Sequence, residues 1–359
     1  MNHTKKALFV GPYPPPIDGH SFAFQTIYDN FKYEKYLINQ NLKGKKFRTL
    51  EFLLIFWKYI SFSFNTKITV LYIAGSRSVF GSLKDIILIN AFSRRKVKII
   101  LHIHAANFDL FIHELNPILR PFFIKAYKRV DVFITLLDAM KKEYALFKDT
   151  SEIHTVENFY DKLLDTPHTN TKEDNKINLV YFSNLMYSKG VFVLLDAFKI
   201  LCEKYDNIKL NIAGAYSSDV FMSEKDVQKK IEKYIDTNKN ITYLGSVYDL
   251  KKQNLLLNSD ISILPSFYSS EAFPISIIEA MKCGCAIITT NHHYLPNVVT
   301  EKNGICIEKQ SVKQLCEAIE YFIQNKNILR DIQNFNMQYA TDRYSPELYI
   351  TKLTELIIK

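Results

Sequence analysis

Short, apolar segments rich in β-branched residues alternate along the chain with longer segments of helical periodicity, and this alternation constrains the fold more than any other feature. Strands in such a chain pair in parallel, and the helices cover both faces of the sheet. The segments expected to be strands in the first half are 6–11, 68–73, 97–104 and 132–136. The segments expected to be helices there are 22–31, 49–60, 80–92 and 117–129, the last of them beginning at Pro117.

The same alternation starts again after a polar stretch, residues 155–175, whose lack of periodicity is typical of a linker. The strands expected beyond it are 177–182, 208–213, 241–244, 261–264 and 286–290. The helices expected there are 191–205, 223–235, 249–257, 275–281, 312–323, 328–339 and 346–358.

The chain has 359 residues, which is long for a single hydrophobic core. We therefore expect an α/β protein with two Rossmann-like, doubly wound domains that face each other across a cleft. The expected domains are residues 1–165 and 166–340. Residues 341–359 are expected to form a C-terminal helix that packs back on the N-terminal domain.

Two carboxylates, Glu271 and Glu279, lie on either side of an expected helix start at Pro274. The free amides and the dipole of a helix start suit an anion such as a diphosphate. Carboxylates beside that anion suit neutral hydroxyl partners, as in a sugar or a ribose. A surface helix with an acidic residue at its start explains the same residues, so both interpretations stay open. The amides expected to lack helical partners are those of Phe273, Ile275 and Ser276.

Lys189 follows the expected strand 177–182 and lies at the entrance of the helix 191–205. A cation at this end of a helix opposes the dipole and therefore calls for an anion nearby. A phosphate of a bound donor is one candidate for that anion. A solvated loop lysine is the alternative, and the position alone does not separate the two.

Two features of the first half also stand at expected strand ends. Gly19 ends a proline-rich loop after the first strand, where a glycine lets the backbone approach a ligand closely, although an ordinary surface turn has the same composition. His102 and His104 alternate along one strand and so share a face of the sheet, with His104 nearer the carboxyl end where ligands bind. Each histidine also has a structural interpretation, and without a neighbouring carboxylate we expect no metal there.

The spacing of Glu271 and Glu279, followed by Ala280, Met281 and Gly284, resembles the signature of the family-four group of retaining glycosyltransferases, which have the GT-B fold. The resemblance covers nearly the whole chain, and its segments occur in the order of the family. The other matching segments are Ser183-Asn184 with Lys189-Gly190, 212–214, 243–247, 260–266, the loop ending at Gly19, His104 and Asn158.

The resemblance implies a role for each of these residues. Glu271 would contact donor-sugar hydroxyls near the reacting carbon, and His104 would contact the sugar near the acceptor; these two are the expected catalytic residues. Glu279 would bind the ribose of the nucleotide. Lys189 and the Gly19 loop would hold the diphosphate together with the helix start. The remaining expected donor-binding residues are Asn184, Phe273, Pro274, Ile275, Ser276, Gly245 and Val247.

One residue departs from the family pattern, because many members carry arginine where this chain has Asn184. Lys189 and the helix dipole must then hold the phosphates more tightly, or another basic residue must substitute. The chain contains no Asp-x-Asp motif, so the sequence does not indicate a metal-bridged diphosphate. It also contains no Gly-x-Gly-x-x-Gly fingerprint of nicotinamide binding. We expect no cofactor and no metal beyond the nucleotide sugar itself.

The net charge of +9 lies in the first part of the chain. Residues 1–170 contain 24 Lys and Arg against 15 Asp and Glu, whereas residues 171–359 contain 22 of each. Such a basic half suggests an anionic partner, and the apolar, basic-flanked stretch 43–64 is a candidate for contact with an anionic membrane. A solvated basic surface explains the charge equally, and a core helix explains the stretch. No nucleic-acid partner is expected, because the aromatic residues lie within apolar runs.

The five cysteines are scattered, and the apolar run near the first residue is about four residues long, too short for a signal peptide. These features favour a cytoplasmic location, at the inner face of the cell membrane if the basic half binds lipid.

The sequence thus predicts an enzyme, a glycosyltransferase of the hexosyltransferase type that acts with retention of configuration. Its donor is expected to be a nucleotide sugar, with a UDP-sugar favoured. Its acceptor is expected to be a saccharide or lipid-linked saccharide of a bacterial surface polysaccharide. Two other classes stay open: a nucleotide-sugar epimerase, and a non-catalytic protein that binds sugar nucleotides.

Overall fold

The computed structural model of the chain describes residues 5–41, 57–59, 61–62, 64–65, 67–166 and 176–359. Most of the helix expected at 49–60, and of the apolar stretch 43–64, lies outside these residues. Contacts divide the chain into two compact units. The N-terminal unit comprises Met1–Asn158 and Pro346–Lys359, and the C-terminal unit comprises Phe159–Ser345.

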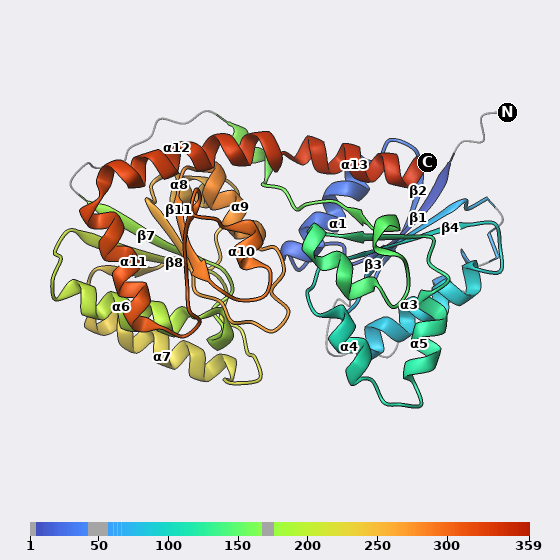
Figure 1. The fold of residues 1–359 in the computed structure, drawn as a ribbon, viewed down its shortest axis with the longest axis horizontal. Helices are drawn as coiled ribbons and strands as arrows, with labels where there is room; N and C mark the ends of the chain where they lie inside the picture. Colours follow the sequence, from blue (N-terminus) through green and yellow to red (C-terminus); the bar gives the residue numbers. More distant parts are fainter. Residues whose placement is uncertain (1–4, 42–56, 60, 63, 66, 167–175) are drawn as a thin grey trace. The chain divides into compact units, whose positions relative to one another are not determined.

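The N-terminal unit is built on a six-stranded parallel sheet of order β2-β1-β3-β4-β5-β6 (Figure 1). The chain leaves β1 towards one edge of the sheet to form β2 and later builds β3 on the other side of β1. This reversal creates a topological switch point at β1. The strands are β1 (Lys6–Gly11), β2 (Glu34–Asn39), β3 (Val70–Gly75), β4 (Lys98–Ile103), β5 (Val132–Thr135) and β6 (His154–Thr155).

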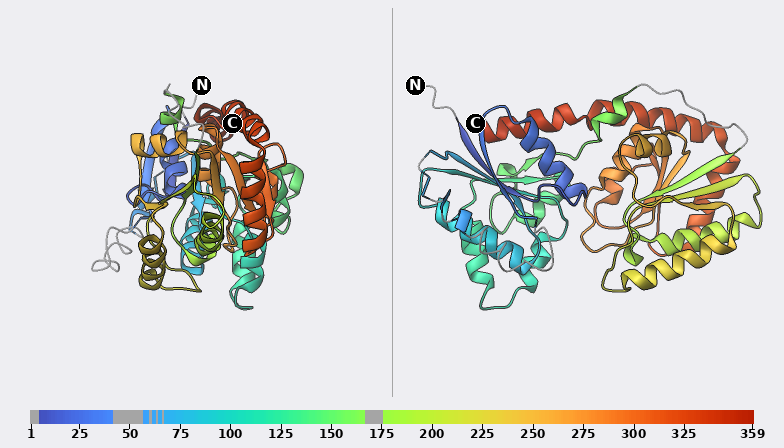
Figure 2. Two further views of the ribbon diagram at one scale, coloured as in Figure 1. Left: turned by 90° about the vertical axis from the view of Figure 1, so that its left-hand side faces the viewer. Right: turned by 180° about the vertical axis from the view of Figure 1, so that it is seen from behind.

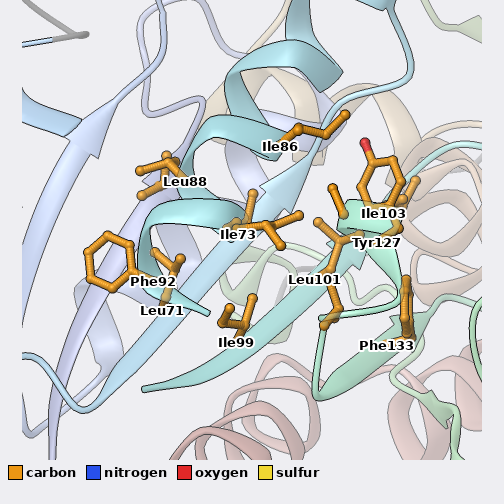
Figure 3. Close-up of a cluster of buried hydrophobic side chains, with 14 of the residues drawn as sticks. Leu71, Ile73, Ile86, Leu88, Phe92, Ile99, Leu101, Ile103, Tyr127 and Phe133 are labelled. Atoms are coloured by element: carbon orange, nitrogen blue, oxygen red, sulfur yellow. The ribbon is translucent and has the colours of Figure 1, made fainter. Parts of the chain in front are cut away.

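Helices cover both faces of this sheet. On one face, α3 and α5 pack against the apolar side chains of β3, β4 and β5 in the buried cluster of Figure 3. Elsewhere α13 packs against α1, and the Tyr349 hydroxyl donates to the carbonyl of Ala23 at 3.2 Å. The helices are α1 (Gly19–Asn30), α3 (Val79–Phe92), α4 (Phe108–Glu114), α5 (Arg120–Tyr127) and α13 (Pro346–Ile358), with 3-10 helices η1 (Asp138–Tyr144) and η2 (Thr150–Glu152).

The C-terminal unit has a second six-stranded parallel sheet, of order β12-β11-β10-β7-β8-β9. Its strand order reverses between β7 and β10, so the loops that follow these two strands open at a switch point. The strands are β7 (Ile177–Phe182), β8 (Ile208–Ala213), β9 (Ile241–Tyr243), β10 (Ile261–Leu264), β11 (Ala286–Thr290) and β12 (Gly304–Ile307).

Helices again lie on both faces of the sheet: α11 packs against α6 on one side, and α12 packs against α9 on the other (Figures 1 and 2). The helices are α6 (Val191–Cys202), α7 (Glu224–Thr237), α8 (Asp249–Leu257), α9 (Ile275–Lys282), α10 (Leu295–Val298), α11 (Val312–Gln324) and α12 (Lys326–Arg343), with 3-10 helices η3 (Lys162–Asp165) and η4 (Tyr187–Lys189). No helix among the described residues combines the length and apolar composition that crossing a bilayer requires.

The expected α/β class with two doubly wound parallel sheets is confirmed, and the differences are local. The strands β2, β6 and β12 were not predicted; in β2 only Ile38 is fully buried, so its apolar pattern is weak. The predicted helix start at Pro117 is wrong. Residues 116–119 form a turn in which the Leu119 amide donates to the Asn116 carbonyl, and α5 begins at Arg120 with Pro121 in its first turn.

Candidate functional site

Lys189 and Glu271 form a largely buried ion pair at the switch point of the C-terminal sheet. Lys189 follows β7, Glu271 follows β10, and Lys189 Nζ lies 2.7 Å from Glu271 Oε2. Ser266 Oγ donates to the same carboxylate oxygen at 2.6 Å, and Glu271 is only 6% exposed. The ammonium also lies 5.1 Å from the centroid of the Tyr268 ring. In this structure the anion beside Lys189 is therefore the carboxylate of Glu271.

The backbone holds the two loops together. Gly190 has φ +78°, and a Cβ built on it would lie 2.0 Å from the carbonyl oxygen of Pro265. Next to it, the Phe267 amide donates to the carbonyl of Ser188 at 2.7 Å. A residue without a side chain is required at 190 for this close approach. The pairing of Lys189 with Glu271 is thus fixed by main-chain contacts between the two loops.

The start of α9 lies directly beyond Glu271. Pro274 is the N-cap residue, and no side chain caps the helix. Ile275 and Ser276 are half-buried, and in the described part of the chain their amides have no hydrogen-bond acceptor. Uncapped amides at a helix start form a site for an anion. Phe273, which precedes the cap, is buried, and its ring lies edge-on to that of Tyr344 at 5.4 Å.

Glu279 lies inside α9 and pairs with a lysine that the sequence analysis did not identify. Lys252 Nζ lies 2.6 Å from Glu279 Oε1 and 2.8 Å from Asp161 Oδ2. Burial lowers the pKa of Lys252, but the charges of Glu279 and Asp161 outweigh burial and raise it. Its neighbour Lys251 is exposed. Nothing in the local sequence distinguishes the two lysines, because burial of one of them is decided by packing of α8.

Each of the two carboxylates faces a lysine in the structure, Lys189 for Glu271 and Lys252 for Glu279. The hydroxyl partners predicted from the sequence belong to a bound sugar and ribose, and they stay a prediction. Buried charges persist where they are paired and hydrogen-bonded, and both pairs meet that condition. Lys252 and Asp161 are site residues that the sequence did not indicate, and Ser266, which lies in the matching segment 260–266, was given no role there.

Three further expected donor-binding residues lie at the carboxyl ends of β7 and β9. Asn184 is exposed, and its carbonyl accepts from the Tyr181 hydroxyl at 3.0 Å. Gly245 has φ +66°, nothing lies within 4 Å of the Cβ position built on it, and its carbonyl accepts from the Gly214 amide. Val247 is buried. These residues share one edge of the C-terminal sheet with Lys189 and the α9 start.

The N-terminal unit brings three histidines together at the carboxyl end of its sheet. The ring centroids of His102 and His104 lie 4.1 Å apart, so the prediction that they share a face is confirmed. His20, in the first turn of α1, places its ring 5.0 Å from that of His104. Asp18 caps α1 by accepting from the Ser21 amide, and this cap sets Gly19 and His20 at the helix start.

The imidazoles of this histidine cluster (His20, His102 and His104) are held neutral. Burial lowers the pKa of His102 to about 3, with His20 adding to the effect, and burial likewise lowers the pKa of His104. The Tyr72 hydroxyl lies 2.7 Å from His102 Nδ1. The Nε2 atoms of all three rings are buried and find no hydrogen-bond partner among the described residues. Neutral imidazoles with open nitrogens suit hydroxyl ligands, which can both donate and accept.

In the described ranges no group of three or more His, Cys, Asp and Glu side chains is arranged to hold a metal ion. The histidine rings lie against one another with tilted planes.

Comparison with known proteins locates a family within the chain. Residues 165–338 match the family model described as "Glycosyl transferases group 1". A human protein named as part of phosphatidylinositol N-acetylglucosaminyltransferase is 28% identical over 168 residues, which cover 47% of this chain and 33% of that protein. The Staphylococcus aureus "Capsular polysaccharide biosynthesis glycosyltransferase CapM" is 24% identical over 177 residues, 49% of this chain and 44% of that protein. The matched segments span less than half of either relative.

Solved structures resemble the chain over nearly its full length. A crystal structure of the Anabaena protein HepE in complex with UDP and glucose superimposes with a TM-score of 0.74 at 15% identity, covering 99% of this chain and 100% of HepE. The chain therefore has the GT-B fold, and residues 165–338, a little less than half of it, match the glycosyl transferase group 1 family.

Proposed function

We propose that this chain is a retaining glycosyltransferase that takes a sugar from a nucleotide diphosphate sugar, with a UDP-sugar favoured. The observation that carries the proposal is the buried pair of Lys189 and Glu271 beside the uncapped start of α9. A cation and free amides suit the diphosphate, and a carboxylate suits sugar hydroxyls. All three meet at the switch point of a parallel sheet, the ordinary ligand position in this architecture.

The diphosphate would accept from the amides of Ile275 and Ser276 and from Lys189. A lysine ammonium has three donors, and only one of them is used by Glu271 in the structure. In the reaction the bond between the sugar C1 and the phosphate oxygen breaks, and its electrons remain on the diphosphate. The helix start and Lys189 would stabilise that charge as it develops. The same groups would compensate for the absence of an arginine at position 184, where this chain has Asn184.

Glu271 would orient the donor sugar. Lys189 and Ser266 both use its Oε2, whereas no described residue donates to Oε1. That oxygen is available for a sugar hydroxyl next to C1. The acceptor hydroxyl would attack C1 from the face that the diphosphate leaves, and its proton would pass to the leaving phosphate. No added metal is needed for this step in the proposal.

Glu279 would bind the ribose while Lys252 holds its carboxylate in place. In the N-terminal unit the neutral imidazole of His104 would contact the transferred sugar, and Gly19 at the start of α1 would lie close to the donor phosphates. Gly245 and Val247 would line the position of the base.

Relatives named for N-acetylglucosaminyl transfer and for capsular polysaccharide synthesis support a saccharide or lipid-linked saccharide as acceptor. The UDP found with HepE supports a uridine donor.

A thermal-shift panel of UDP-, GDP- and ADP-sugars tests the proposal, because a ligand that binds only the folded state raises the unfolding temperature. We expect a UDP-sugar to give the largest shift without added metal. A flat response to every nucleotide sugar would contradict the proposal. Turnover of a UDP-sugar into its epimer without any acceptor would instead identify the chain as an epimerase. Binding without turnover in the presence of saccharide or lipid-linked acceptors would favour a non-catalytic protein.

A further inference from the structure

A cavity of about 440 Å³ opens at the amino ends of the strands in the N-terminal unit, at the opposite edge of the sheet from the histidine cluster. Three arginines line it, Arg94 and Arg95 after the end of α3 and Arg129 after the end of α5. Ser93 and Asp131 also line it, together with the side chains of Val97 and Ile99. One carboxylate oxygen of Asp131 accepts from the Ile99 amide at 2.7 Å. The lining of the cavity thus contains three guanidinium groups and one carboxylate.

The fold brings the arginines together. The helices α3 and α5 each connect parallel strands, so both run towards the amino edge of the sheet, and they pack side by side (Figure 1). Arg129 donates from its guanidinium to the side-chain oxygen of Asn90, near the end of α3. Arg95 donates to the carbonyl of Asn65 at 2.5 Å, and its guanidinium carbon lies 5.3 Å from the centroid of the Phe92 ring. Arg94 and Arg129 are exposed.

Helix ends attract cations, and one basic residue after each helix would need no further explanation. Here there are more basic residues than the two helix ends require, because Lys96 follows the two arginines and Lys128 precedes Arg129. Both lysines are exposed. Guanidinium groups that line one cavity are suited to phosphate oxygens, which they bind in a two-pronged geometry.

The outward faces of the same two helices carry exposed apolar side chains. Phe80 in the first turn of α3 is 84% exposed, and Phe122 in α5 is 66% exposed. Ile87 in α3 and Ile118, just before α5, are exposed as well. Lys84 and Lys125 lie on the same helices. Large apolar side chains set among basic residues are the pattern of surfaces that lie in a lipid–water interface.

We propose that this α3/α5 face is a docking surface for an anionic phospholipid bilayer, with the arginine cavity taking a lipid phosphate. A small phosphate compound alone would account for the arginines but would leave the exposed Phe80 and Phe122 without a function. A bilayer accounts for both, because the headgroup phosphates meet the arginines and the acyl boundary meets the aromatic rings. Binding of a bilayer to this face needs no transferase activity, so it can be tested independently of the proposed function.

The test is co-sedimentation of the full chain with two kinds of vesicle. One kind contains phosphatidylcholine alone, and the other also contains about 30% phosphatidylglycerol, which gives a clear anionic surface charge. We expect binding only to the anionic vesicles, weakening as salt rises. Each basic residue at such a surface contributes roughly fivefold to partitioning, so the triple variant R94Q/R95Q/R129Q should bind about a hundredfold more weakly. A matched variant of exposed lysines on α7, K225Q/K229Q/K233Q, removes the same charge and should bind like the wild type.

A second variant, F122S, separates lipid insertion from charge alone: it should weaken binding to anionic vesicles while leaving the arginines in place. Unfolding temperatures of all the variants identify any loss of fold. Equal loss of binding in the arginine and α7 variants, or wild-type binding by the arginine variant, would overturn the proposal. So would displacement from the vesicles by millimolar inorganic phosphate at constant ionic strength, because the cavity would then take free phosphate.

Discussion

A Cβ on Gly190 would lie 2.0 Å from the carbonyl oxygen of Pro265, closer than any real Cβ contact. The loop after β7 therefore reaches the loop after β10 only because residue 190 is glycine. Since Lys189 and Glu271 stand on these two loops, this contact sets the ion pair at the centre of the candidate site.

Gly190→Ala should separate the two loops. The substitution meets both an unfavourable positive φ, about 1 kcal/mol, and a main-chain overlap that adds about 2 kcal/mol or more. Gly245→Ala is the matched control, because Gly245 also has positive φ but has nothing within 4 Å of its Cβ position. Urea unfolding should show a loss of about 1 kcal/mol for the control and clearly more for Gly190→Ala. Equal losses in the two variants would contradict the close contact.

The pair of Lys189 and Glu271 should behave as a coupled unit. Lys189→Met leaves a buried carboxylate without its cation, which costs about 3 kcal/mol, whereas adding Glu271→Gln removes that unpaired charge and should recover part of the loss. The two single variants and the double variant form a cycle that urea unfolding can measure. Additive effects would show that the two side chains do not interact. If the proposed function holds, both single variants should also reduce sugar transfer by about a hundredfold or more.

Much of this arrangement could be predicted from the sequence, and the reasons differ between residues. Strands such as β7 and β10 are short apolar runs bounded by polar loops, so their periodicity locates the loops that carry Lys189 and Glu271. The α9 start follows from Pro274. The edge strand β2 was not predicted, because an edge strand buries few side chains and so shows little apolar pattern.

The partners of the carboxylates could not be predicted in the same way. The contact of Lys252 with Glu279 joins residues 27 positions apart, and its contact with Asp161 joins residues 91 positions apart. Which of two adjacent lysines turns inward depends on how α8 packs, and that is decided by tertiary contacts rather than by local sequence. The approach of His20 to His104 likewise depends on where α1 begins relative to β4.

Lys252 should be more important for stability than its neighbour on α8. Lys252→Met removes the cation shared by Glu279 and Asp161 and should lower the free energy of unfolding by about 3 kcal/mol. Lys251→Met, on an exposed residue of the same helix, should change it by less than about 0.5 kcal/mol. Chemical unfolding of the two variants measures this difference. A similar small effect in both would mean that the buried pair contributes nothing to folding.

Asp85 should make the stability of the N-terminal unit depend on pH. This carboxyl group is fully buried in α3, and burial raises its pKa to about 7 although the Ser76 amide donates to it at 2.9 Å. Because the pKa in the folded state lies above the ordinary value of 3.8, the folded chain holds a proton that the unfolded chain releases between about pH 4 and pH 7. The contribution of Asp85 to stability is therefore present below about pH 4 and is lost as the pH rises towards about 7.

Asp85→Asn keeps the shape of the side chain and removes its titration. The variant should be more stable than the wild type at about pH 8, by a few kcal/mol at most since one pKa unit corresponds to about 1.4 kcal/mol. The advantage should shrink as the pH falls to about 5, where the wild-type carboxyl is protonated in the folded state. Urea unfolding of both chains from about pH 5 to about pH 8 measures the difference, with Asp109→Asn on the exposed face of α4 as the control. A constant difference across this range would show that the buried carboxyl does not titrate there.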